Sequence, residues 1–184
     1  MGALISSLFS WLFGGSKYPA LGPNPDKPND ITGLTPREAR AVVVTWDIVK
    51  PNMAHHGVQF FLRLFERHPN IQKKFSGFDG KPLAVLQEDK RLRAHATTVM
   101  NAINSVVESL GDPETLVEIL KTTGKNHKRR GIEKTHFESL RVVLLDYLRD
   151  NLGTAYSPMA QQGWSKALAA VNAVIFQAYD LPEK

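Results

Sequence analysis

The stretch Leu120-Lys-Thr-Thr-Gly-Lys-Asn-His127 places a histidine near the end of a short helical segment, directly before the basic run at 128–130. A second histidine, His95, lies upstream in a longer helical pattern. It shares an apolar face with residues three and four positions apart, namely Leu92, Val99 and Ile103. Taken singly, His95 is typical of a core histidine, and His127 of a helix end, where a cation suits the dipole. Their combination suggests the hypothesis that they face one another across a flat ligand, which helical spacing alone does not establish.

The chain around these histidines is helical from Leu34 onward, and no stretch reads as a strand. Thr35-Pro36-Arg37-Glu38 is a capping box with proline at the first helical position, and Thr135-His136-Phe137-Glu138 is a second. Apolar periodicity and caps predict helices at about 35–49, 52–67, 69–75, 87–110, 113–127, 135–151 and 158–179. We therefore predict an all-α domain of about seven helices joined by short loops.

Composition excludes several classes of site. The chain has 184 residues and no cysteine, which removes disulfides, thiol nucleophiles, thiolate metal sites and thioether cofactor links. The net charge of +5 is spread among 18 acidic residues, and only residues 128–130 cluster. A solvated surface is the better interpretation, and we expect no nucleic-acid partner. No apolar run approaches the roughly 20 residues that cross a bilayer.

Residues 1–33 form a predicted N-terminal extension. Met1-Gly-Ala-Leu-Ile-Ser6 matches the signal for N-myristoylation at Gly2, and a proline-rich, flexible linker follows. A secretory signal peptide is the rival interpretation, although no Lys or Arg precedes the apolar segment. The third interpretation is a disordered tail that happens to begin with Met-Gly. Because one acyl chain binds membranes weakly, the apolar residues at 8–13 would have to help. The first interpretation predicts a cytoplasmic protein held by lipid at the inner face of a membrane.

Residues 34–181 resemble a globin, with a short tail at 182–184. The resemblance rests on several segments in the right order and spacing: Leu34-Thr35 at the start, Trp46, the corner from His68-Pro69 to Phe75 and Phe78, Arg93-Ala94-His95-Ala96 with Val99 one turn later, Leu120–His127, and Trp164. It implies a globin fold of about seven to eight helices around a haem pocket. Gly57 and Ala96 are small where the second and central helices of that fold cross.

The resemblance also implies a cofactor and its ligands. Haem b would take His127 as its proximal iron ligand, with His95 on the distal side as hydrogen-bond donor or second iron ligand. The slot would be lined by Phe75, Val99, Phe61 and Leu140. Arg130 would pair with a haem propionate, or simply be solvated. Thr123, where globins commonly carry an apolar residue, would bond either the proximal imidazole or, as we favour, its own helix backbone.

Two functions follow from the resemblance. The first is a haem protein that reversibly binds O2, NO or CO, tethered to a membrane by its acylated tail and not acting as an enzyme. The second is a six-coordinate, haem-dependent oxidoreductase in redox signalling, nitric oxide dioxygenation, nitrite reduction or peroxide reduction, which would need a separate reductase. A haem-free scaffold requires both histidines to be accidental. A bilin-binding relative is disfavoured because no cysteine can attach the pigment.

Overall fold

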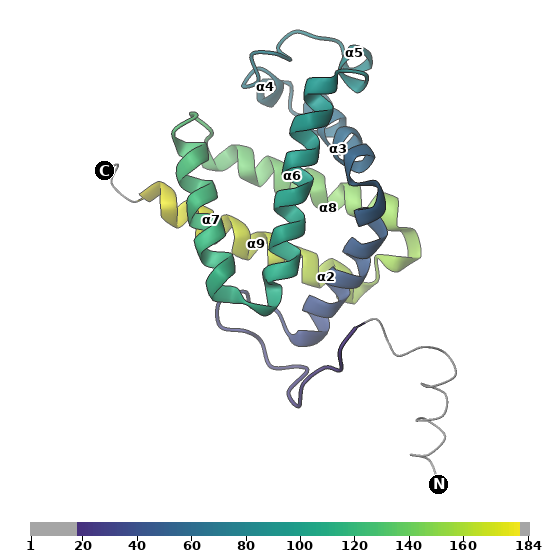
Figure 1. Ribbon diagram of the computed structural model, residues 1–184, viewed down its shortest axis with the longest axis vertical. Coiled ribbons are helices and arrows are strands. Elements are labelled where there is room, and N and C mark those ends of the chain that lie inside the picture. Colours follow the sequence, from purple (N-terminus) through teal and green to yellow (C-terminus); the bar gives the residue numbers. More distant parts are fainter. Residues whose placement is uncertain (1–17, 181–184) are drawn as a thin grey trace.

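The computed structural model describes residues 18–180, and within that range the chain is helical with no strand (Figure 1). The helices are α2 (Pro36–Val49), α3 (Met53–Arg67), α4 (Pro69–Gln72), α5 (Leu83–Gln87), α6 (Lys90–Glu108), α7 (Pro113–Lys128), α8 (Lys134–Leu152) and α9 (Pro158–Asp180), with 3-10 turns at Lys50–Asn52, Ser109–Gly111 and Gly153–Ala155. The predicted all-α fold is confirmed. α6 and α7 are joined through the 3-10 turn at Ser109–Gly111, α8 and α9 cross behind them, and α4 and α5 lie at one end of α6.

The capping box predicted from the sequence, formed by Thr35 and Glu38, sets the start of α2. The Thr35 hydroxyl accepts a hydrogen bond from the Glu38 N–H at 3.2 Å, and the Glu38 carboxylate accepts one from the Thr35 N–H at 2.8 Å. Glu38 is buried, and Lys166 of α9 donates to it at 2.7 Å. Burial alone would raise the pKa of Glu38, but the bonds from Lys166 and Thr35 outweigh it and lower the pKa. One helix cap therefore also joins α2 to α9.

Close helix crossings depend on glycines. A Cβ added at Gly57 would lie 3.0 Å from the Ala96 carbonyl oxygen, so α3 crosses α6 backbone to backbone, as predicted for this pair. A Cβ at Gly163 would lie 2.7 Å from the Glu38 carbonyl oxygen, where α9 crosses α2. These distances are shorter than van der Waals contact, so neither position has room for a side chain.

Two tryptophans hold the crossing of α2 and α9 together. The rings of Trp46 and Trp164 lie 5.8 Å apart in the core. The Trp164 indole N–H donates to the Thr45 hydroxyl at 2.9 Å, and that of Trp46 donates to Asn104 of α6 at 3.0 Å. Each buried indole therefore has a partner for its one polar group.

Two details differ from the sequence prediction. The expected capping box at Thr135–Glu138 is wrong, because α8 begins at Lys134 and the His136 Nδ1 accepts the N–H of Glu133 at 2.9 Å. Thr135 thus lies inside the helix. The stretch expected to be a loop before the central helix contains α5, and α6 starts only at Lys90, where the Asp89 carboxylate accepts the Arg91 N–H at 2.8 Å.

Part of the predicted N-terminal extension lies against α2. The Tyr18 hydroxyl donates to Asp47 at 2.7 Å, and Arg37 pairs with Asp26 at 2.8 Å. Residues 1–17, with Gly2 among them, and residues 181–184 lie outside the described part of the chain, so the domain limits stay predictions. Within residues 18–180, no helix has the length and apolar character needed to span a membrane.

Candidate functional site

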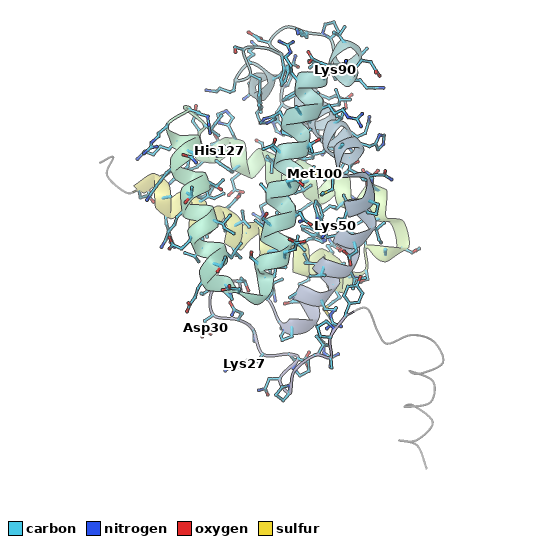
Figure 2. The ribbon with its side chains drawn as sticks, viewed as in Figure 1. Lys27, Asp30, Lys50, Lys90, Met100 and His127 are labelled. Carbon is cyan, nitrogen blue, oxygen red and sulfur yellow. The ribbon has the colours of Figure 1, made fainter. Side chains whose placement is uncertain are left out.

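His127 lies near the C-terminal end of α7 (Figure 2), and its imidazole is oriented by the helix itself. Its Nδ1 lies 2.8 Å from the carbonyl oxygen of Thr123. Because a carbonyl can only accept, Nδ1 carries a proton and donates it, so that in the neutral imidazole Nε2 has the free lone pair. The Thr123 hydroxyl donates to the carbonyl of Ile119 at 2.9 Å. The side chain of Thr123 therefore bonds its own helix backbone, as we favoured, while its carbonyl orients the imidazole.

Packing against a neighbouring aromatic ring also restrains the orientation of the His127 imidazole. The ring of Phe137, one turn into α8, meets it edge-on with centroids 5.2 Å apart. Phe137 is itself held by Tyr179 of α9 at 6.2 Å. Gly124 allows α7 to approach α9, since a Cβ there would lie 2.8 Å from the Ile175 carbonyl oxygen. The imidazole is thus held both by its own helix and by the two helices behind it.

His95 of α6 sits between two aromatic rings. The centroids of Phe61 and Phe75 each lie 5.1 Å from its imidazole, and both contacts are edge-on. Its ring makes no hydrogen bond within residues 18–180. Burial lowers the pKa of His95, and electrostatic repulsion from His127 lowers it further. His95 is therefore neutral at pH 7, with a lone pair and an N–H to offer, and it lies within electrostatic range of His127.

The predicted pocket residues fall into two groups in the structure: apolar residues packed in the core, and the exposed Arg130. Phe61 is fully buried, and Phe75, Val99 and Leu140 are half-buried against the same core cluster. Arg130 is exposed in the turn after α7, and its guanidinium lies 3.4 Å from the carbonyl oxygen of Asn126 in that helix. Phe61 and Phe75 therefore contact His95, and Val99 and Leu140 pack against the core cluster that contains Phe61, whereas Arg130 lies outside that cluster.

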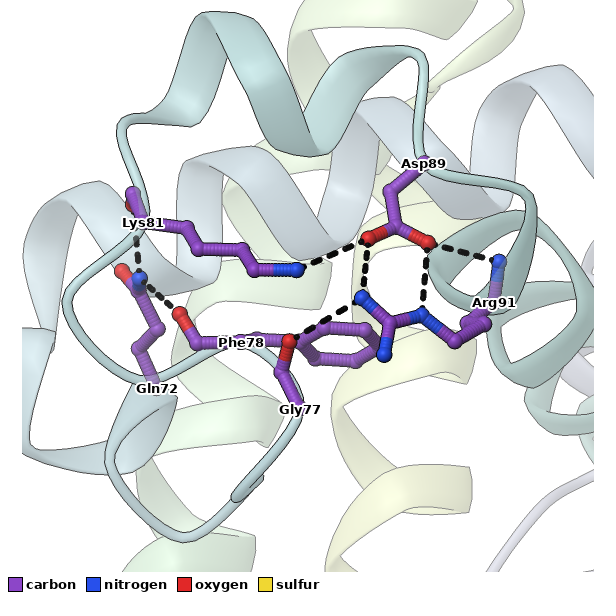
Figure 3. Close-up of polar contacts among 6 residues, drawn as sticks. All are labelled: Gln72, Gly77, Phe78, Lys81, Asp89 and Arg91. Atoms are coloured by element: carbon purple, nitrogen blue, oxygen red, sulfur yellow. Dashed lines mark hydrogen bonds and ion pairs between the residues drawn. The ribbon is translucent and has the colours of Figure 1, made fainter.

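A polar network fixes the loop between α4 and α6 (Figure 3). Gln72 donates to the carbonyls of Phe78 and Lys81 at 2.7 and 2.9 Å. Asp89 accepts from Arg91 at 2.8 Å and from Lys81 at 3.4 Å. These hydrogen bonds, above all those from Arg91, hold the pKa of Asp89 well below its usual range. The loop carries Phe78, whose ring stacks with that of Phe75 at 5.6 Å, so the network positions the aromatic wall beside His95.

Sequence reasoning did not single out Gln72, Lys81 and Arg91 as members of this network. Asp89 is the residue before α6, and a carboxylate at that position is a common local signal of a helix start. Gln72 bonds Lys81 nine residues away, and Arg91 bonds the Gly77 carbonyl 14 residues away, through a loop whose sequence has no periodicity. These residues come together only when the loop has folded.

The site fits a flat, mostly apolar group that carries an axial metal position. His127 offers a lone pair on Nε2 in a fixed orientation, and the neutral His95 of α6 lies within electrostatic range of it. Phe61 and Phe75 supply apolar surface. A neutral imidazole whose other nitrogen donates to a carbonyl is the usual form of a histidine metal ligand. This donor set and lining suit haem.

Comparison with known proteins identifies the family. The family model described as Globin matches residues 58–175. Cytoglobin-2 of Danio rerio is 36% identical over 148 residues, which cover 79% of this chain and 83% of the relative. The anaerobic nitrite reductase HBII of Casuarina glauca is 30% identical over 146 residues (78% and 91%), and a globin of Nerita albicilla is 26% identical over 145 residues (79% and 92%). The chain therefore belongs to the globin family, whose members generally bind haem and gaseous ligands.

Proposed function

We propose that this globin binds haem b through His127 and reversibly binds oxygen and related diatomic gases on the side facing His95. The observation that carries the proposal is the 2.8 Å contact between His127 Nδ1 and the Thr123 carbonyl. That bond selects the tautomer in which Nε2 has a lone pair for iron, and makes the imidazole a stronger donor. Haem, when bound, supplies the iron that takes the gas.

The other residues of the proposed site act on the bound gas and around the cofactor. The neutral His95 donates a hydrogen bond from its ring N–H to a bound ligand that carries partial negative charge. Phe61 and Phe75 limit the space beside that ligand, and with Val99 and Leu140 they exclude water from the apolar faces of the cofactor. Arg130, exposed at the end of α7, is proposed to pair with a propionate.

A second candidate function has its own support. The His95 ring has no hydrogen bond within residues 18–180, so its lone pair is available to bind iron directly. Six-coordinate haem suits electron transfer, nitric oxide dioxygenation, peroxide reduction or nitrite reduction, and one relative is named as a nitrite reductase. The protein would then act as a haem-dependent oxidoreductase with a separate reductase as partner.

The absorption spectrum of the reduced, ligand-free protein distinguishes these two functions. Five-coordinate iron is expected to give one broad visible band, and we expect this state if His95 serves only as a hydrogen-bond donor. If His95 binds iron, two sharp bands should appear, and His95→Leu should convert them to the broad band because the sixth ligand is removed. A wild-type protein that takes up no haem and binds no CO would contradict both functions.

We further propose that the N-terminus is acylated at Gly2 and holds the protein at the inner, cytoplasmic face of a membrane. The support is the Met1–Ser6 signal, with the apolar residues of 8–13 as the second attachment. The intact mass of protein made in a eukaryotic host should show one tetradecanoyl addition that is absent from Gly2→Ala. An unmodified Gly2, or cleavage within the apolar segment, would contradict this proposal.

A further inference from the structure

A second pair of ionisable rings lies outside the residues assigned to haem. Tyr147 of α8 is only 4% exposed, and its hydroxyl oxygen lies 2.8 Å from Nδ1 of His56 on α3. A buried phenol needs an acceptor for its proton, and the imidazole nitrogen is the acceptor that the structure provides. Tyr147 therefore donates to His56, with the imidazole proton on Nε2.

Both members of this pair are uncharged near neutral pH. Burial raises the pKa of Tyr147 to about 12, so the phenol keeps its proton. Burial, and then repulsion from His55, lowers the pKa of His56, so its Nδ1 is free to take a proton. The guanidinium of Arg63 lies 5.7 Å from the centre of the Tyr147 ring, but its charge is paired with Asp150 at 2.8 Å. The pair thus combines an oxidisable ring with an adjacent base.

A chain of aromatic contacts leads from Tyr147 to the haem side. The ring of Tyr147 lies 6.2 Å from that of Phe60, which lies 5.3 Å from that of Phe61. Phe61 in turn lies 5.1 Å from His95. These rings are packed with no intervening solvent, since Phe60 and Phe61 are 0% and 2% exposed. An electron therefore has a short, dry route between the phenol and the distal side of the haem site.

The small exposed part of Tyr147 borders a groove at the surface. It lines a groove of about 550 Å3 between α3, α5 and α8, together with polar side chains that include His55, Gln59 and Asn151. A groove of this size accepts a small aromatic molecule, and its amides and imidazole can bond hydroxyl groups. The groove is a place where a small reductant can meet the ring without entering the haem pocket.

We propose that Tyr147 is a redox-active residue that passes oxidising equivalents from the haem to small phenolic reductants in this groove. Hydrogen peroxide is the oxidant, reduced to water as the haem is oxidised. Tyr147 returns one electron to the haem, its O–H bond breaks, and the proton moves to His56 Nδ1, which leaves a neutral phenoxyl radical and an imidazolium. A phenol in the groove then gives one electron to the Tyr147 radical and releases its own proton to solvent, while His56 returns its proton to the Tyr147 oxygen, so that both residues are restored. This inference rests on the proposed haem binding.

The test is an electron paramagnetic resonance spectrum of the ferric holoprotein frozen shortly after peroxide is added. Wild type should show a phenoxyl radical whose signal narrows when the protein carries ring-deuterated tyrosine. Tyr147→Phe should lose most of that signal, whereas the matched variant Tyr156→Phe should keep it. His56→Leu should lower the radical yield several-fold, because the proton acceptor is gone. Peroxide-dependent oxidation of guaiacol should fall in parallel in Tyr147→Phe.

Two controls separate the outcomes. Each variant's haem spectrum and CO binding are recorded on the same sample, and both should match wild type because Tyr147 and His56 touch neither His127 nor His95. A radical of unchanged intensity in haem-loaded Tyr147→Phe would overturn this inference alone. A wild-type protein without haem would overturn both this inference and the proposed function.

Discussion

Replacing His127 by alanine is expected to leave a folded protein that does not retain haem. The substitution removes the proposed iron ligand, while the Thr123 carbonyl and the Phe137 ring that orient it stay in place. Changing an outer partner of a metal ligand already weakens metal binding by about 10–100-fold, so loss of the ligand should exceed that. Haem retention is measured from the haem absorption left after gel filtration. Added imidazole should restore a haem spectrum, because it fills the vacated position.

The matched control is His55→Ala, which removes an exposed histidine from α3 and should leave haem retention unchanged. Circular dichroism of His127→Ala should keep its helical signal. A normal haem spectrum in His127→Ala without added imidazole would show that iron is bound elsewhere, and the assignment of the proximal ligand would be wrong.

Gly163→Ala is expected to cause the largest loss of stability of any single methyl added at a helix crossing. The new Cβ would lie 2.7 Å from the Glu38 carbonyl oxygen and 3.0 Å from a Val42 methyl. The closest atom belongs to backbone inside α2, so the helices must separate. Overpacking of this kind costs about 1–3 kcal/mol, and more where backbone must move. Against this, alanine gains roughly 1 kcal/mol of helix propensity over glycine. Because the contact is with backbone, we expect a net loss of about 1–2 kcal/mol in the free energy of unfolding.

Urea unfolding followed by circular dichroism measures this loss. The control is Gly111→Ala, because a Cβ at Gly111 meets nothing within 4 Å, and its midpoint should stay close to that of wild type. If Gly163→Ala and Gly111→Ala unfold at the same urea concentration, then α2 and α9 are not in backbone contact at this crossing.

Much of the fold follows from local signals. The Thr35–Glu38 cap, Asp112-Pro113 and Ser157-Pro158 mark helix starts that the structure reproduces, because a cap is satisfied by residues within one turn. The second predicted capping box, at Thr135–Glu138, was placed by the same kind of local pattern, but α8 in fact begins at Lys134. His136 takes the Glu133 N–H, and a histidine at that position is not part of the usual pattern. Local rules therefore locate a helix well but its first residue less well.

The sequence by itself determined that this chain is an all-α globin and drew attention to His127 and His95. Spacing along a helix is encoded locally, and the order of motifs is visible without coordinates. Only the tertiary structure decided that the Thr123 carbonyl orients His127, that Phe61 and Phe75 enclose His95, and that His56 meets Tyr147 across 91 residues. The contact of His95 with Phe61 depends on how closely α3 and α6 cross, which Gly57 allows. The separation between two crossing helices is not encoded in any short-range sequence pattern.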